Sequence, residues 1–122
     1  MNEVLANTLL WGGIITITAG LQGIFLDKYL QLSYKMSVTE SLGRLFSRTW
    51  GFNTAILGAL MITASQNTAL TTVITLAAIL SKTLLIGTIL FTGNGRLRAP
   101  MKSIIAVDSI MTLLLIYGLA IN

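Results

Sequence analysis

The sequence predicts an all-α integral membrane protein: an antiparallel bundle of four membrane-spanning helices, with a short interfacial helix before the second span. Of its 122 residues, 54% are hydrophobic and only 10% are charged, whereas an ordinary soluble domain carries about 25% charged residues. A chain this short buries a smaller fraction of its surface on folding than a larger domain does, too little to hide so much apolar surface. The composition therefore excludes a water-soluble globule, a disordered chain and a free nucleic-acid-binding protein.

The charges fall in blocks separated by uncharged runs long enough to cross a bilayer, which takes about 20 apolar residues. Residues 4–26 form one such run, and residues 49–81 form a second that is too long for one helix. The polar tetrad at 65–68 divides the second run. A turn cluster at 92–95 and the only proline, Pro100, precede the last span. We predict one transmembrane domain over residues 1–122, with spans at about 4–26, 45–64, 69–91 and 101–121.

The basic residues predict the orientation of these spans. Seven of the eight lie in or beside the loop between spans one and two and the loop between spans three and four: Lys28, Lys35, Arg44, Arg48, Arg96, Arg98 and Lys102. The positive-inside rule places both loops in the cytoplasm and both termini outside, as in an inner (plasma) membrane protein. The net charge of +4 then lies beside anionic lipid and indicates no nucleic-acid partner.

The first basic loop has a helical pattern of its own. Ser37 and Glu40 have the spacing of a capping box. Two helical faces follow, one apolar (Val38, Leu42, Leu45, Phe46) and one charged (Glu40, Arg44, Arg48). We expect an interfacial helix over about 38–47 that merges into the second span. The alternative is that these residues simply extend that span.

Two charges, Lys82 and Asp108, lie inside predicted spans. A charge in hydrocarbon costs about 2.5–3.5 kcal/mol on insertion scales, so it usually faces the bundle interior and is paired. At 1.5 Å per residue, Lys82 is about 15 Å and Asp108 about 9 Å from the cytoplasmic ends of their spans. A lysine stem covers this difference, so we predict a Lys82–Asp108 ion pair. Arg48 is a second possible partner for Asp108.

Other polar side chains are predicted at a similar depth in the cytoplasmic half. Together with the two charges they outline a candidate polar pocket, made of Lys82, Asp108, Arg48, Asn53, Gln22, Thr75 and Thr112. One interpretation is a binding site for a small anion, a polar head group or a proton. The other is a buried ion pair whose hydrogen bonds fix the helix register.

Small residues form a stripe on each of the first two spans: Gly13, Thr16, Gly20 and Gly23 on the first, and Gly51, Ala55 and Ala59 on the second. Such stripes let helix backbones approach closely. They indicate either tight packing within the bundle or a dimer face. Trp50 and Tyr34 are predicted near the inner membrane interface, where aromatic residues are common.

Catalysis has little support in the sequence. The chain has no histidine and no cysteine, which removes the usual general base, the thiol nucleophile and most metal ligands. The one remaining chemistry is lysine-based, and Ser81 beside Lys82 would point about 100° away on a helix. We therefore expect a protein that is not an enzyme and that has no cofactor and no metal.

The chain resembles the DoxX-like superfamily of small four-helix membrane proteins. The resemblance is carried by a first span, an amphipathic loop, residues 44–51 (RLFSRTWG) entering span two, and Asp108 in span four. It implies an antiparallel four-helix bundle, and some members of such families are membrane subunits of redox systems. It implies no catalytic residue, and Lys82 lies outside its pattern.

These observations lead to two expectations about function. The first is an accessory protein that binds a lipid or small molecule in the bilayer, or acts with a partner membrane protein or as a homo-oligomer. The alternative is a small transporter or channel that uses an intramembrane Lys82–Asp108 pocket.

Overall fold

A computed structural model describes residues 1–92 and 100–122, and over these residues helices are the only regular structure. The predicted all-α class is therefore confirmed for this part of the chain. The rest of the predicted turn at 92–95, with Arg96 and Arg98, lies outside the described residues. The helices are α1 (Glu3–Ile17), α2 (Gly20–Ile24), α3 (Leu26–Tyr34), α4 (Ser41–Ser65), α5 (Thr68–Thr92) and α7 (Lys102–Ala120).

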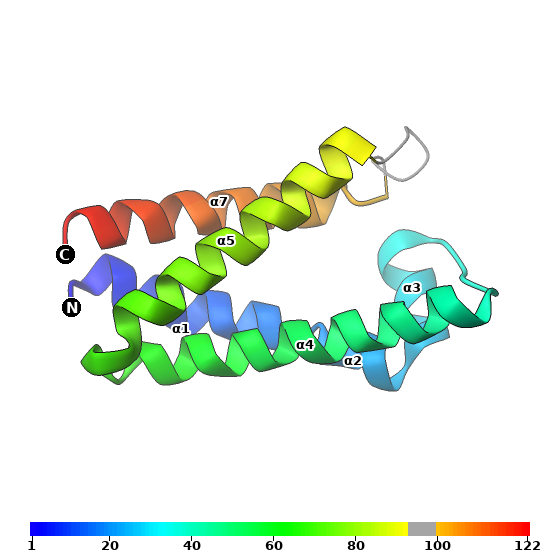
Figure 1. The fold of residues 1–122 in the computed structure, drawn as a ribbon, viewed down its shortest axis with the longest axis horizontal. Coiled ribbons are helices and arrows are strands. Elements are labelled where there is room, and N and C mark those ends of the chain that lie inside the picture. The colour runs from blue at the N-terminus through cyan, green and yellow to red at the C-terminus, as the bar shows by residue number, and fades with distance from the viewer. Residues whose placement is uncertain (93–99) are drawn as a thin grey trace.

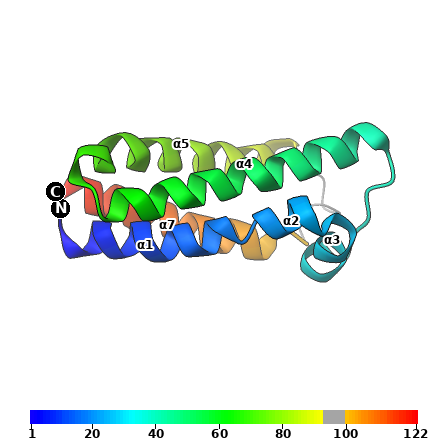
Figure 2. The ribbon, with the colours of Figure 1, turned by 90° about the horizontal axis from the view of Figure 1, so that it is seen from below.

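The long helices lie side by side, with both chain termini at one end of the molecule and α3 at the other (Figures 1 and 2). We call these the termini end and the α3 end. The helix α4 runs back along α1 and α2, and α7 contacts both α1 and α5. At the termini end, the Asn2 side chain accepts a hydrogen bond from Leu5 N at 2.9 Å and donates one to Gly118 O at 2.7 Å. Asn2 thus caps α1 and ties it to α7.

Three helical segments of the described chain are long and apolar enough to cross a membrane: Glu3–Ile24, Thr68–Phe91 and Lys102–Ala120. They correspond to the predicted first, third and fourth spans. The helix α4 has the same length as α5 but does not meet this measure of hydropathy. Its first half carries Arg44, Arg48 and Asn53, which lowers the mean hydropathy of any window that includes them.

The first predicted span is not one continuous helix. The helix α1 ends at Ile17, and the chain resumes as α2 at Gly20. Between them, Thr18 N donates to Ile15 O and Ala19 N to Thr16 O, which are i→i+3 bonds. Thr18 and Ala19 have the backbone angles of a 3₁₀ turn. A second break at Phe25, with φ −118° and ψ 59°, separates α2 from α3.

The predicted start of the interfacial helix, at about residue 38, is wrong, because α4 begins at Ser41 and continues without a break to Ser65. The short amphipathic helix is α3, where Leu26, Leu30 and Tyr34 are buried at i, i+4 and i+8. It ends because Lys35 adopts the left-handed conformation, with φ 53°, which lets Met36 N bond Leu30 O. The capping-box prediction is wrong as well, since α4 begins only after Glu40, and Glu40 makes no side-chain cap bond. Residues 41–47 are the first turns of α4, as the alternative expected.

The small-residue stripes face each other inside the chain, between α1–α2 and α4. A Cβ atom built on Gly13 would lie 2.7 Å from Gly58 O, and one on Gly51 would lie 2.7 Å from Ala19 O. These glycines permit backbone contact that no other residue allows. The dimer-face alternative is therefore wrong for the buried glycines, which are covered within one chain.

An apolar core fills the half of the molecule towards the termini end. Its buried members come from α1, α4, α5 and α7 and comprise Leu5, Leu9, Met61, Ala64, Ile74, Ala78, Met111 and Leu115. A smaller cluster, Leu26, Leu30 and Tyr34, packs α3 against its neighbours at the α3 end. Between the two clusters lies the region that holds the buried charges.

Candidate functional site

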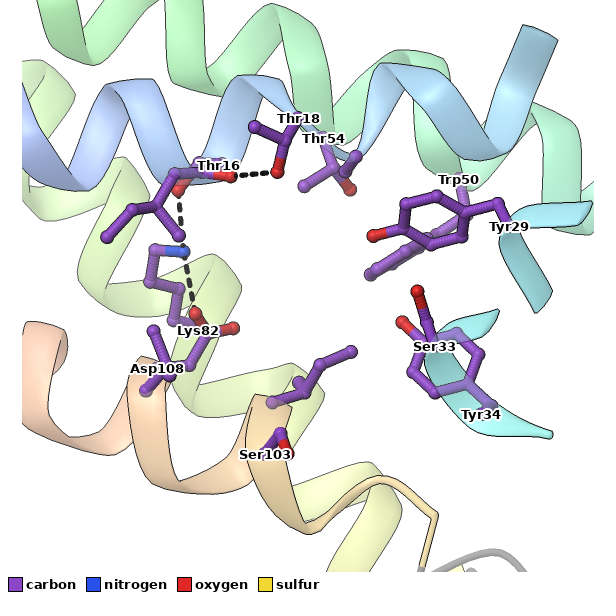
Figure 3. A pocket seen from close by; sticks show the side chains of 14 residues that line it. Thr16, Thr18, Tyr29, Ser33, Tyr34, Trp50, Thr54, Lys82, Ser103 and Asp108 are labelled. Atoms are coloured by element: carbon purple, nitrogen blue, oxygen red, sulfur yellow. Dashed lines mark hydrogen bonds and ion pairs between the residues drawn. The ribbon is translucent and has the colours of Figure 1, made fainter. Parts of the chain in front are cut away.

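Lys82 and Asp108 form an ion pair inside the molecule (Figure 3). The distance from Lys82 Nζ to Asp108 Oδ1 is 3.1 Å, and the side chains are only 5% and 14% exposed. The ammonium also donates to Thr16 Oγ1 at 3.1 Å. Arg48 is not the partner of Asp108, because its Nη1 donates instead to Gly23 O at the end of α2.

The pair is positioned by three helices. Lys82 follows the core residue Ala78 by one turn of α5, so it shares the buried face of that helix. Asp108 lies on α7, and the Thr112 hydroxyl bonds the Asp108 carbonyl oxygen at 2.6 Å one turn later. Thr16 comes from the last turn of α1, just before the break. The pair thus connects α5 and α7 to the end of α1.

A cavity of about 370 Å³ opens beside the pair, within the size range of small-molecule sites. Figure 3 shows Lys82, Asp108 and Thr16 on one side and the side chains of Tyr29, Ser33 and Tyr34 facing them from α3. We call this space the Lys82 cavity. Its lining is Ile15, Thr16, Thr18, Ala19, Tyr29, Ser33, Tyr34, Trp50, Thr54, Lys82, Ser103, Ile104, Val107 and Asp108. Hydroxyl-bearing side chains from α1, α3, α4 and α7 therefore line one cavity beside the buried ion pair.

The break between α1 and α2 lies at the wall of this cavity. Thr18 and Ala19, which carry the i→i+3 bonds, both line it. The Thr18 hydroxyl also donates to Ile15 O, at 2.6 Å, so this carbonyl accepts two hydrogen bonds from Thr18. An interrupted helix, a buried charge pair and a polar cavity coincide at one place in the fold.

A second cavity, of about 310 Å³, reaches the pair between α4 and α5. It shares Trp50, Thr54, Lys82 and Asp108 with the Lys82 cavity, and Ser81 lies in its wall. Towards the termini end, the apolar core begins directly at Ala78. Both cavities therefore approach the pair from the part of the molecule nearer the α3 end.

The structure separates the residues predicted for the polar pocket. Only Lys82 and Asp108 line the Lys82 cavity. Gln22 is buried, and its Nε2 donates to Ser47 O at 2.8 Å, so it ties α2 to α4 as Arg48 does. Asn53 is exposed on α4, while Thr75 is fully buried in the apolar core region.

The polar pocket predicted from the sequence did not include the hydroxyl-bearing residues of α3. No role was predicted for Tyr29 and Ser33, and Tyr34 was predicted near the inner membrane interface. Tyr34 is only 6% exposed and packs edge-to-face on Tyr29 at 6.2 Å between ring centroids. The burial period Leu26–Leu30–Tyr34 is the signal that could have placed α3 and its hydroxyls.

Two side chains of α3, Asp27 and Tyr34, have shifted pKa values. The Arg44 guanidinium bonds Asp27 at 2.6 Å and holds the pKa of that carboxyl below its ordinary value. Burial raises the pKa of the Tyr34 phenol, so this hydroxyl stays protonated and able to donate. The first effect ties α3 to α4, and the second keeps the cavity wall uncharged at that position.

Among the described residues, no group of three or more His, Cys, Asp or Glu side chains could hold a metal ion. No protein-family model, curated protein or solved structure matches this chain. The site therefore has to be interpreted from its own geometry.

Proposed function

We propose that this chain is an integral membrane protein that binds a small molecule or a lipid head group in the Lys82 cavity. The observation that carries this proposal is the helix break at Thr18 and Ala19 beside the buried pair. A short 3₁₀ stretch inside a long helix often marks a functional hinge, and in a bilayer irregular backbone is tolerated where it is buried in protein or lines a water-filled cavity. Discontinuous helices also mark the substrate sites of many transporters. A polar, wetted cavity accounts for the break and for the charges together.

In this proposal α4 supplies a fourth span. The helices α1, α5 and α7 are each apolar enough to cross, and α1 begins where α7 ends. The chain must then return across the same thickness in α4, which lies against α1, α2 and α5. The polar first half of α4 is partly covered by α2 and α3. The result is an antiparallel four-helix membrane bundle, the layout of the DoxX-like superfamily that the sequence resembles.

The proposed orientation places the α3 end in the cytoplasm and both termini outside an inner (plasma) membrane. Five described basic residues lie at or near the α3 end: Lys28, Lys35, Arg44, Arg48 and Lys102. The first and last turns at the termini end carry no lysine or arginine. The positive-inside rule supports this orientation. A partner membrane protein or a second copy would contact the exposed apolar faces.

The proposed role is non-enzymatic. The two buried charges are bonded to each other, and the sequence supplies neither histidine nor cysteine. A small transporter or channel is the alternative, favoured by the second cavity that reaches the pair between α4 and α5. The apolar core at Ala78 separates both cavities from the termini end. This separation favours a binding site that opens to one side of the membrane.

Single-cysteine accessibility tests the proposal, because the chain has no cysteine of its own. We expect Thr54→Cys in the cavity wall to react with a charged, membrane-impermeant thiol reagent added at the cytoplasmic face. Lys102→Cys, exposed at the start of α7 and outside the cavity wall, is the positive control, and Ala78→Cys in the core is the negative control. Reaction of Thr54→Cys from both faces would establish the transporter alternative. A failure to react from either face would overturn a wetted binding cavity.

A further inference from the structure

An apolar groove between α1 and α7 lies beside the Lys82 cavity. This groove has a volume of about 310 Å³ and shares Ile15 and Val107 with the cavity. From there it follows α1 to Asn7, eight residues or about 12 Å of helix. Its wall residues Trp11 and Ile110 are 63% and 61% exposed, so the groove is open to the surrounding bilayer. The polar Lys82 cavity and the apolar groove thus lie next to each other and have two wall residues in common.

The charges of Lys82 and Asp108 in the Lys82 cavity sum to zero, but both side chains can form further hydrogen bonds. Lys82 Nζ has three N–H donors, of which one bonds Asp108 Oδ1 and one bonds Thr16 Oγ1. One donor remains. Among the described residues, Asp108 Oδ2 accepts no side-chain hydrogen bond. A donor and an acceptor are therefore available side by side.

The neighbouring donor and acceptor determine which kind of ligand head group can bind beside the ion pair. An anion attracted to Lys82 would lie against the Asp108 carboxylate, and a cation attracted to Asp108 would lie against the ammonium. A hydroxyl group both donates and accepts, so neighbouring hydroxyls satisfy both charges without repulsion. The hydroxyls of Tyr29, Ser33 and Thr54 in the remaining wall fit the same kind of head.

We infer that the ligand of the Lys82 cavity is an amphiphile with an uncharged polyhydroxyl head and a single apolar chain. The head group lies in the Lys82 cavity, hydrogen-bonded to Lys82 and Asp108. The chain lies in the groove between α1 and α7. This inference rests on the proposed binding function and names its ligand class.

The test compares three amphiphiles with the same acyl or alkyl chain length on delipidated full-length protein. The detergent is zwitterionic, because an alkyl glycoside would itself belong to the proposed ligand class. The probes are a monoacylglycerol, its phosphorylated anionic counterpart and an alkyltrimethylammonium. Binding is measured by titration with native mass spectrometry. We expect the monoacylglycerol to bind at one per chain, at least about tenfold more tightly than either charged probe.

Two variants report on the head and the chain separately. Asp108→Asn leaves the Lys82 charge uncompensated, so we expect the preference to shift to the anionic probe. Ile110→Trp, on the exposed wall of the groove, should weaken monoacylglycerol binding by about tenfold. The matched control is Leu76→Trp, which is 52% exposed on α5 and lines no described cavity. It should bind like the wild type.

The possible failures are distinguishable. Tighter binding of the anionic or the cationic probe to the wild type would overturn the uncharged head while retaining a binding site. Equal effects of Ile110→Trp and Leu76→Trp would overturn the groove as the chain site. Saturable binding of none of the three probes would overturn the proposed binding function itself.

Discussion

A Cβ atom placed on Gly58 would lie 2.5 Å from the backbone nitrogen of Ile17. This contact brings the last turn of α1 against the middle of α4, one residue before the helix break. The close approach of the two backbones therefore fixes the position of the residues that open the Lys82 cavity.

Gly58→Ala is expected to destabilise the protein, because the added methyl group meets backbone atoms that cannot rotate away. Overpacking of this kind costs about 1–3 kcal/mol. The matched control is Gly87→Ala on α5, where a Cβ atom meets nothing within 4 Å. That change should stabilise the helix by about 0.5–1 kcal/mol. Thermal unfolding in detergent measures both, and equal effects of the two changes would contradict the close packing of α1 on α4.

The Lys82–Asp108 pair should show strong energetic coupling. Lys82→Met leaves a buried carboxylate unpaired, which costs about 3–5 kcal/mol in soluble proteins. The double change Lys82→Met with Asp108→Leu should recover much of the loss, with a coupling of at least about 1 kcal/mol. Lys102→Met, at an exposed position, is the control and should be nearly neutral. If the two substitutions lower the free energy of unfolding additively, Lys82 and Asp108 are not energetically coupled, which would contradict the ion pair.

The Asp27–Arg44 contact should make the packing of α3 sensitive to acid. The pKa of Asp27 is lowered by the hydrogen bond from Arg44, so the contact stabilises the folded state above the ordinary pKa of 3.8. It is lost as the pH falls below that value and through the lowered pKa. The difference in melting temperature between wild type and Asp27→Asn should be constant above about pH 5 and vanish in stronger acid.

The control for this measurement is Glu40→Gln, an exposed carboxyl in the same segment. Among the described residues Glu40 makes no ion pair, so its substitution should give no such pH-dependent difference. A difference between wild type and Asp27→Asn that persists unchanged at low pH would show that the ion pair does not stabilise α3.

The sequence predicted what periodicity and charge determine locally. The uncharged run at 49–81 and the tetrad at 65–68 placed α4, α5 and the turn between them, and the proline before the last span placed α7. Helical depth paired Lys82 with Asp108. The break at Thr18 was not predictable, because threonine and alanine both continue a helix and the apolar run is uninterrupted there. Backbone geometry and the cavity beside it depend on tertiary contacts.

The polar pocket was harder to predict than the ion pair within it. Gln22 and Arg48 have the residue types of a ligand site, but the structure uses them to bond backbone oxygens between α2 and α4. One of these oxygens, Gly23 O, belongs to the end of α2, whose position the pattern did not indicate. The hydroxyls of Tyr29 and Ser33 were hidden because α3 was taken for a loop.

The most direct measurement of a binding role is the identity of the molecules that co-purify with the protein. Wild type, Lys82→Gln and Lys102→Gln are extracted in the same mild detergent, and the bound small molecules and lipids are quantified by mass spectrometry. We predict a stoichiometric species that is retained by the wild type and by Lys102→Gln and is lost from Lys82→Gln. Retention of the same molecules by Lys82→Gln and wild type would contradict a binding site built on Lys82.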